Sequence, residues 1–150
     1  MKIVTGIMLT LLLVGMLTLA FDIQLVKAEP RTWTVNDDGP ADFHTIQEAV
    51  DAATWGDTIF VHNGTYYENV VISKPILLVG ESRAATVVNG NCTGNVVTIN
   101  FPVWQSTKAK ISGFTLQNGT MGISGRDDIY AEDITIQGNA GWGFDANGAF

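Results

Sequence analysis

The chain has 150 residues, of which 46% are hydrophobic, and a formal net charge of −7. That length is enough for one domain. The acidic balance and the lack of a Lys and Arg cluster exclude a nucleic-acid-binding protein, because nothing would neutralise the phosphates. Cys92 is the only cysteine, so an internal disulfide is excluded and the domain depends on its core.

The first 28 residues have the features of a secretory signal. Lys2 precedes an apolar run over 3–20, and Val26-Lys27-Ala28 has the small-x-small spacing of a cleavage site. We expect a signal peptide over 1–28, a mature domain over 29–150, and a secreted, periplasmic or cell-surface location. An uncleaved membrane anchor is the alternative, because the region after the apolar run is long and polar.

The mature chain opens with one strand and one short helix. Apolar residues alternate within 31–35, which predicts a strand. Thr45 and Glu48 stand at capping-box spacing, and the apolar positions that follow recur with the period of a helix. The sequence therefore predicts an amphipathic helix that begins at Thr45 and ends before Gly56.

Short alternating segments follow the helix, and two of them repeat. Phe114-Thr115-Leu116-Gln117 recurs twenty residues later as Ile134-Thr135-Ile136-Gln137. A period near twenty with one apolar face is typical of a solenoid, whose coils bury their inner faces by stacking as parallel strands. Antiparallel hairpins at Asn63-Gly64 and Asn89-Gly90 are the alternative.

These segments resemble the coils of the right-handed parallel β-helix proteins of the pectin-lyase-like group. The resemblance rests on 57–61, 64–72, 78–81 and 111–118. Within this group, the chain is most similar to secreted repeat proteins and NosD-type periplasmic domains. The resemblance implies an all-β solenoid of about four coils, closed at its N-terminal end by the amphipathic helix. It also implies an uncapped last coil, either because the domain is truncated or because this end associates with another copy.

The apolar positions that alternate in these segments should point into the coils. The expected core residues are Ile59, Val61, Val70, Ile72, Ile76, Leu78, Val88, Val97, Ile99, Ile111, Phe114, Leu116, Ile123, Ile129, Ile134 and Ile136.

The resemblance implies several functions, because one fold hosts unrelated chemistries. We expect a non-catalytic module with a structural, adhesive or carbohydrate-binding role, whose partner is a polysaccharide or a cell-surface glycan. One alternative is a polysaccharide lyase or glycoside hydrolase, or a fragment of one. A second is a NosD-like periplasmic component of copper maturation.

The strongest acidic constellation is Arg126-Asp127-Asp128 with Glu132 and Asp133. Two adjacent acids match part of the polygalacturonase pattern, but its Gly-His-Gly element is absent. A solvated turn explains the spacing, so no catalytic residue is assigned and Arg126, Asp127, Asp128 and Asp133 remain candidates only.

A metal site is not predicted. His44, His62, Cys92 and Met121 show no ligand spacing, although these are the residue types that copper sites use. We therefore expect no cofactor.

Ligand binding and glycosylation have separate candidates. Trp104, in an insertion over 100–109, could offer its ring to a sugar together with Tyr66 and Tyr67, unless Trp104 folds back onto the coil. Asn-x-Thr acceptors for N-linked glycans occur at Asn63, Asn91 and Asn118, each at a predicted turn.

Overall fold

The computed structural model describes residues 29–101, 108–125 and 129–146, which form eleven strands and one helix. The elements in chain order are β1 (Thr32–Val35), α2 (Ile46–Ala52), β2 (Thr58–Val61), β3 (Gly64–Tyr66), β4 (Val70–Ile72), β5 (Leu77–Gly80), β6 (Thr86–Asn89), β7 (Val97–Ile99), β8 (Ala109–Gln117), β9 (Ile123–Gly125), β10 (Ile129–Gln137) and β11 (Phe144–Ala146).

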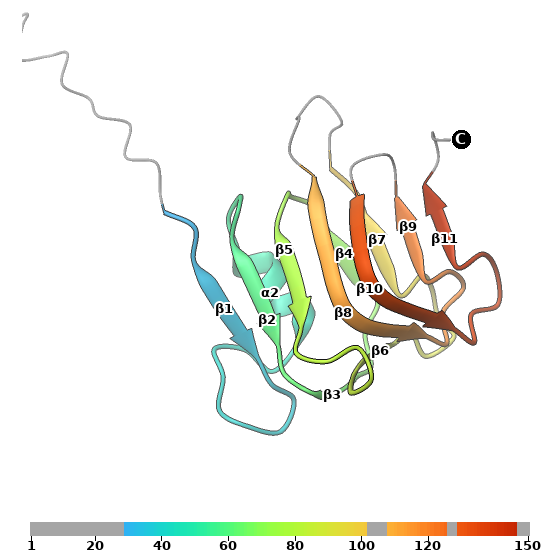
Figure 1. Ribbon diagram of the computed structural model, residues 1–150, viewed down its shortest axis with the longest axis horizontal. Coiled ribbons are helices and arrows are strands. Elements are labelled where there is room, and N and C mark those ends of the chain that lie inside the picture. Colours follow the sequence, from blue (N-terminus) through green and yellow to red (C-terminus); the bar gives the residue numbers. More distant parts are fainter. Residues whose placement is uncertain (1–28, 102–107, 126–128, 147–150) are drawn as a thin grey trace, which may run out of the picture.

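The strands wind into a parallel β-helix (Figure 1). In the larger sheet β1, β2, β5, β8 and β10 follow one another, and in the smaller sheet β4, β7, β9 and β11 do the same. Every strand pairing among the described residues is parallel, so the hairpin alternative is wrong. The predicted right-handed solenoid of about four coils is confirmed.

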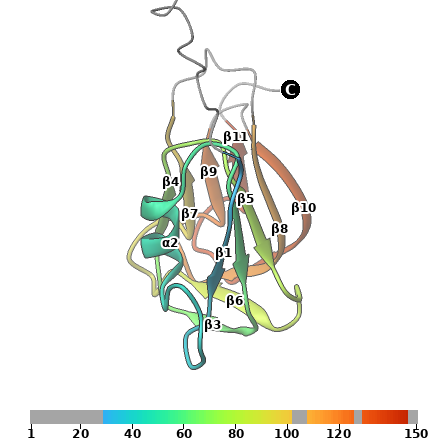
Figure 2. The same cartoon turned by 90° about the vertical axis from the view of Figure 1, so that its left-hand side faces the viewer.

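Each coil has three faces (Figure 2). We call face 1 the surface formed by β1, β2, β5 and the first halves of β8 and β10. Face 2 comprises β3, β6 and the second halves of β8 and β10, and face 3 is the smaller sheet. Seen from the β1 end, face 1 lies on the right, face 3 lies on the left beside α2, and β3 and β6 join them below.

The backbones of neighbouring coils approach closely at the corner between faces 1 and 2 in the third coil. β8 crosses this corner as one strand, pairing first with β5 and then with β6. Gly113 sits at the bend with φ +79, and a Cβ at this position would lie 2.3 Å from the carbonyl oxygen of Gly80. In β10 the bend falls at Asp133, with φ 49, a conformation that Asp tolerates better than most residues. Two neighbouring coils therefore touch through their backbones here.

The residues that line the interior of the coils are largely those predicted from the sequence. Thirteen of the sixteen expected core residues are buried, and Ile129, Ile134 and Ile136 of β10 are partly buried and pack against the same cluster. Among the described strands β10 pairs only with β8 and therefore has a neighbour on one side. This explains why its apolar residues are less enclosed than Phe114 and Leu116 one coil earlier.

The helix α2 packs its buried residues Ile46, Ala49 and Val50 against the first coil. The Glu68 carboxylate accepts hydrogen bonds from the backbone N–H groups of Ile46, at 2.8 Å, and Gln47, at 2.9 Å. A negative charge at this end also suits the helix dipole. Glu68 thus fixes the start of the helix to the coil.

A second side chain fixes the other end of α2. The Nζ group of Lys74 donates to the carbonyl oxygens of Asp51, at 3.0 Å, and Ala53, at 2.8 Å.

The side chain of Gln47 links the helix to β4, because its amide bonds both the N–H and the C=O of Val71. These two backbone groups lie at a strand edge and would otherwise be available to another chain.

We expect Glu68→Gln to lower the free energy of unfolding by about 1–2 kcal/mol, because one oxygen and one charge are lost where two N–H groups need acceptors. Urea denaturation followed by circular dichroism measures the change. Glu48→Gln is the matched control, since Glu48 is exposed in the same helical turn and should change stability by less than about 0.5 kcal/mol. Equal effects of the two variants would contradict the role of Glu68.

The predicted signal peptide over 1–28 lies outside the described residues. In the part of the chain that is described, no helix has the length and apolar character needed to cross a membrane.

Candidate functional site

The outer surface of face 1 carries a row of aligned side chains that crosses all four coils. Strand register places Thr58, Leu77, Lys110 and Tyr130 next to one another. Leu77 is 37% exposed and Tyr130 is 53% exposed. Since paired strands lie about 4.8 Å apart, the row presents apolar and cationic groups along the axis of the solenoid.

Lys110 of this row forms an ion pair with Glu132, which lies two residues beyond Tyr130 in β10. The Nζ group of Lys110 bonds the carboxylate of Glu132 and lies 5.5 Å from the ring centroid of Tyr130. The hydrogen bond with Glu132 raises the pKa of Lys110, and the same bond lowers the pKa of Glu132. Both groups therefore stay charged at neutral pH and neutralise each other beside an exposed aromatic ring.

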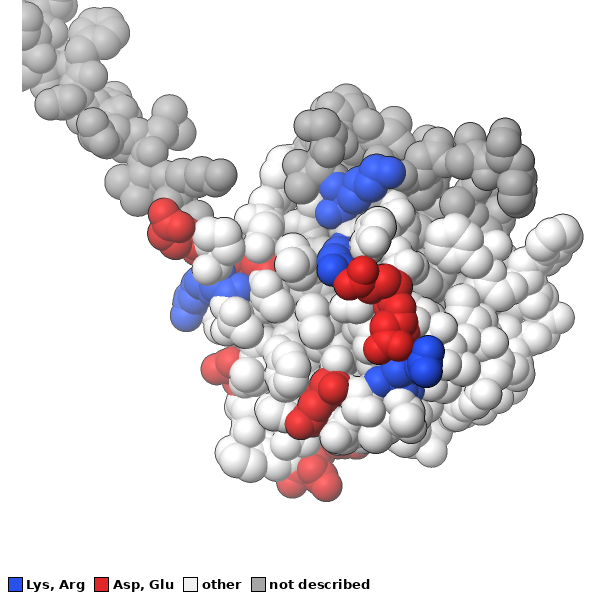
Figure 3. Space-filling model, in the orientation of Figure 1, with Lys and Arg blue, Asp and Glu red and all other residues white. Residues whose placement is uncertain are grey.

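A second ion pair lies where face 1 meets face 2. Arg83 contacts Asp133 at 3.2 Å, and both side chains are more than half exposed. Figure 3 shows acidic and basic side chains lying next to one another on this side of the molecule. The surface is therefore mixed in sign despite the negative charge of the whole chain.

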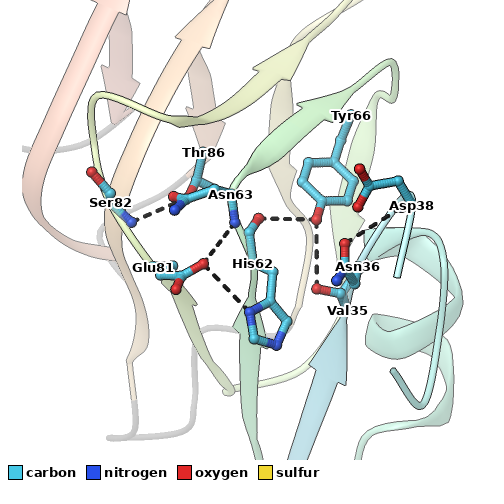
Figure 4. Close-up of polar contacts among 9 residues, drawn as sticks. All are labelled: Val35, Asn36, Asp38, His62, Asn63, Tyr66, Glu81, Ser82 and Thr86. Carbon is cyan, nitrogen blue, oxygen red and sulfur yellow. Dashed lines mark hydrogen bonds and ion pairs between the residues drawn. The ribbon is translucent and has the colours of Figure 1, made fainter. Parts of the chain in front are cut away.

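A histidine and a carboxylate meet at the end of β2 (Figure 4). His62 Nδ1 lies 3.4 Å from Glu81 Oε2, which also accepts the backbone N–H of Asn63 at 2.9 Å. The ring of Phe60 packs edge-on against His62, with centroids 5.1 Å apart. A carboxylate beside Nδ1 orients the imidazole ring, as it does in the histidine–carboxylate pairs of many enzymes.

Sequence reasoning missed the pair of His62 and Glu81. The two residues are 19 positions apart, close to the repeat length found between later segments. Comparing residues one repeat apart would have found the contact.

The two adjacent tyrosines have opposite environments. Tyr66 is 2% exposed, and its hydroxyl donates to the carbonyl oxygen of His62 at 3.0 Å. Burial, with a smaller contribution from Asp37, raises the pKa of Tyr66 to about 12. Its ring has no free face for a sugar, so the prediction is corrected at Tyr66, whereas Tyr67 is 68% exposed.

The most buried acid is structural. Asp57 is 1% exposed and accepts hydrogen bonds from Arg31 N, Trp33 Nε1, Thr54 N and Thr54 Oγ1. Burial alone would raise the pKa of Asp57, but the four donors outweigh burial and lower it. The carboxylate is therefore ionised and occupied by four hydrogen bonds within the protein, which excludes it as a proton donor in catalysis.

Four of the predicted site residues cannot be placed in the fold. Trp104, Arg126, Asp127 and Asp128 lie outside the described residues. The described ranges contain no group of three His, Cys, Asp or Glu side chains that could hold a metal ion.

Comparison with known proteins identifies the family. The sequence profile of the Pectinesterase family matches residues 32–146, which includes all eleven strands. The chain belongs to the pectinesterase family. Pectinesterase 2 of Citrus sinensis is 32% identical over 126 residues, covering 80% of this chain and 22% of the citrus protein. Pectinesterase 3 of Solanum lycopersicum is 33% identical over 114 residues, covering 71% and 18%.

Solved structures of pectinesterases share the fold. A pectin methylesterase mutant in complex with a hexasaccharide superposes with a TM-score of 0.56 at 18% identity, covering 73% of this chain and 46% of that one. Pectin methylesterase from carrot gives a TM-score of 0.50 at 20% identity, covering 71% and 38%. This pectinesterase-family chain spans about a fifth of the length of its curated relatives.

The family corrects two expectations. A structural or adhesive role and the NosD-type likeness rested on a coil pattern that many β-helix proteins share. The family profile instead favours the alternative of a polysaccharide lyase or glycoside hydrolase, or a fragment of one, as far as it named a carbohydrate-active enzyme. The two enzyme classes named there differ from a pectinesterase.

Proposed function

We propose that this chain is an exported protein that acts on pectin and hydrolyses its methyl esters. The single observation that carries the proposal is the match of the pectinesterase profile to residues 32–146. In the reaction, water adds to the ester carbonyl, methanol leaves, and the galacturonate carboxylate and a proton are released. Such a reaction needs a base for the water and a positive group near the developing charge.

The face 1 surface is the proposed place for the polymer. Its row of aligned side chains runs along the solenoid, and Tyr130 offers an exposed ring on which a sugar can stack. Lys110, which is paired with Glu132, is the cation of this row that a galacturonate carboxylate would meet. The pair of His62 and Glu81, at the end of β2, is the candidate base on the same side of the molecule.

Pectin binding without turnover is the second candidate function. The carboxyl groups of Asp42, Asp57 and Glu132 all have lowered pKa values, and each is held by hydrogen bonds to its neighbours. Carboxylates of this kind stabilise the coils and are poorly suited to donate a proton. The described residues therefore offer a surface on which a sugar can bind, but no clear proton donor for catalysis.

The purified chain should release methanol from highly methyl-esterified pectin and bind it in a pull-down assay. We expect His62→Gln to lower the rate of methanol release at least about tenfold with unchanged binding, as loss of a general base predicts. Tyr130→Ala should weaken binding about fivefold to tenfold, as loss of one stacked ring predicts.

Two results would decide against parts of the proposal. Binding without methanol release from the wild-type chain would favour the second function. Tyr67→Ala is the matched comparison, because Tyr67 has a similarly exposed ring on a different part of the coil. If this variant loses binding and Tyr130→Ala does not, the polymer lies elsewhere than on face 1.

A further inference from the structure

We infer that Asn91 carries an N-linked glycan, and that Asn63 and Asn118 do not. All three have the Asn-x-Thr sequence that a glycosyl transferase requires, so the sequence alone leaves them equivalent. The folded domain must leave space for the glycan, whichever stage of biosynthesis attaches it. The inference rests on the proposed export of the chain.

The side chain of Asn91 is open to solvent. Asn91, Cys92 and Thr93 are all exposed in the turn between β6 and β7. Asn91 and Cys92 both have positive φ angles, 49 and 57, so the chain turns sharply at these two residues. Within the described residues, the hydrogen bonds of Asn91 involve its backbone N–H, which donates to Asn89 Oδ1 at 3.0 Å, and none involves its side-chain amide.

The backbone of this turn is held independently of the Asn91 amide. The N–H of Cys92 donates to the carbonyl oxygen of Asn118 at 2.7 Å. Asn69 accepts a hydrogen bond from the hydroxyl of Thr93 at 2.7 Å and donates to the carbonyl oxygen of Asn95 at 2.9 Å. A glycan on Asn91 therefore replaces no contact that keeps the turn in shape.

The other two acceptors face neighbouring coils. Asn63 Oδ1 accepts a hydrogen bond from the hydroxyl of Thr86, a buried residue of the second coil, and Figure 4 shows the Asn63 side chain directed toward it. Asn118 is half-buried, and its Oδ1 lies 3.1 Å from where a Cβ on Gly138 would stand. Asn63 is exposed, but a glycan on its amide would compete with the contact to Thr86, and a glycan on Asn118 would crowd the turn at Gly138 in the next coil.

The chemistry requires an activated sugar as the second reactant. The side-chain nitrogen of Asn91 forms a bond to C1 of a sugar joined to a lipid diphosphate. The bond between C1 and the diphosphate oxygen breaks, the lipid diphosphate leaves, and the amide loses one proton to a base of the transferase. No electron donor or acceptor takes part.

The position also keeps the glycan away from the proposed pectin surface. The turn between β6 and β7 joins face 2 to face 3, whereas Tyr130 and Lys110 lie on the outer side of face 1. A glycan on Asn91 should therefore leave pectin binding unchanged.

The test is secretion of the full chain, with its own first 28 residues, from cells that N-glycosylate a reference protein. Intact mass is measured before and after enzymatic removal of N-linked glycans. We expect one glycan on the wild-type chain and on Asn63→Gln and Asn118→Gln, and none on Asn91→Gln. The melting temperature of Asn91→Gln should equal that of the deglycosylated wild-type chain.

Three results of the mass measurement would overturn the inference directly. These are a glycan that persists in Asn91→Gln, its loss in either of the other variants, and a secreted wild-type chain without any glycan. A chain retained in the cells with its leader attached would overturn the inference through the export on which it rests. Methanol release is measured on separate samples, so a failure of the pectin proposal remains distinguishable from all of these results.

Discussion

Replacing Gly113 with alanine should lower the free energy of unfolding by about 3–5 kcal/mol, enough to leave much of the protein unfolded. The new Cβ would stand 2.3 Å from the carbonyl oxygen of Gly80, which is a backbone atom that cannot rotate away. The φ of +79 adds strain for any residue with a side chain. Urea denaturation, together with the yield of folded protein, measures the effect.

Substitutions at two other glycines separate the steric clash from the backbone strain. Gly56 has φ +86, but a Cβ there would meet only Pro30 Cγ at 3.8 Å, so Gly56→Ala isolates the strain and should cost about 1 kcal/mol. Gly80→Ala isolates the clash, because its Cβ would lie 2.2 Å from the carbonyl oxygen of Gly113. If Gly113→Ala costs no more than Gly56→Ala, the coils do not approach as closely as described.

The second large effect is expected at Asp57. Asp57→Ala should lower the free energy of unfolding by about 3 kcal/mol, because the N–H groups of Arg31 and Thr54 and the indole of Trp33 lose their acceptor. Asp57→Asn should have a similar effect, since the amide keeps one acceptor oxygen and turns an NH₂ group toward donors. Asp51→Asn, at an exposed position of α2, is the control and should change little.

The effect at Asp57 should depend on pH. The pKa of Asp57 is lowered in the folded protein, whereas an unfolded aspartate titrates near about 3.9. The stabilisation is therefore fully present above about pH 4 and is lost as the pH falls through the lower, folded value. The difference in unfolding free energy between the wild-type protein and Asp57→Asn should be constant from neutral pH to about pH 5 and shrink below about pH 4. A difference that grows on acidification would contradict this assignment.

The sequence contained enough information to predict the fold. The period near twenty between 114–117 and 134–137 corresponds to the pairing of Phe114 with Ile134 and of Leu116 with Ile136. Thr45 accepts the N–H of Glu48, as expected for the start of the helix. These features depend on local chemistry and on repetition, both of which are visible in a single sequence.

The contacts that cross coils were harder to predict. Glu68 and Lys74 hold a helix more than twenty residues earlier in the chain, and the contact of His62 with Glu81 appears only when the coils are stacked. The burial of Tyr66 could have been predicted. Adjacent residues of a strand point to opposite sides, so one of the two neighbouring tyrosines has to lie inside the coil. The pectin-lyase-like group was predicted correctly, but the pectinesterase family within it was not, because coil interiors look alike across β-helix proteins of different function.

The corner at Gly113 determines where foreign sequence can be inserted. One extra residue within β8 would shift its alternation and turn Phe114 and Leu116 toward solvent. The turn between β6 and β7 is exposed at 91–93, although its backbone is hydrogen-bonded to the next coil through Gly90 and Cys92. An epitope grafted beside the exposed Asn91 should therefore disturb the stack less than the same graft at the corner, which would disrupt two coils together.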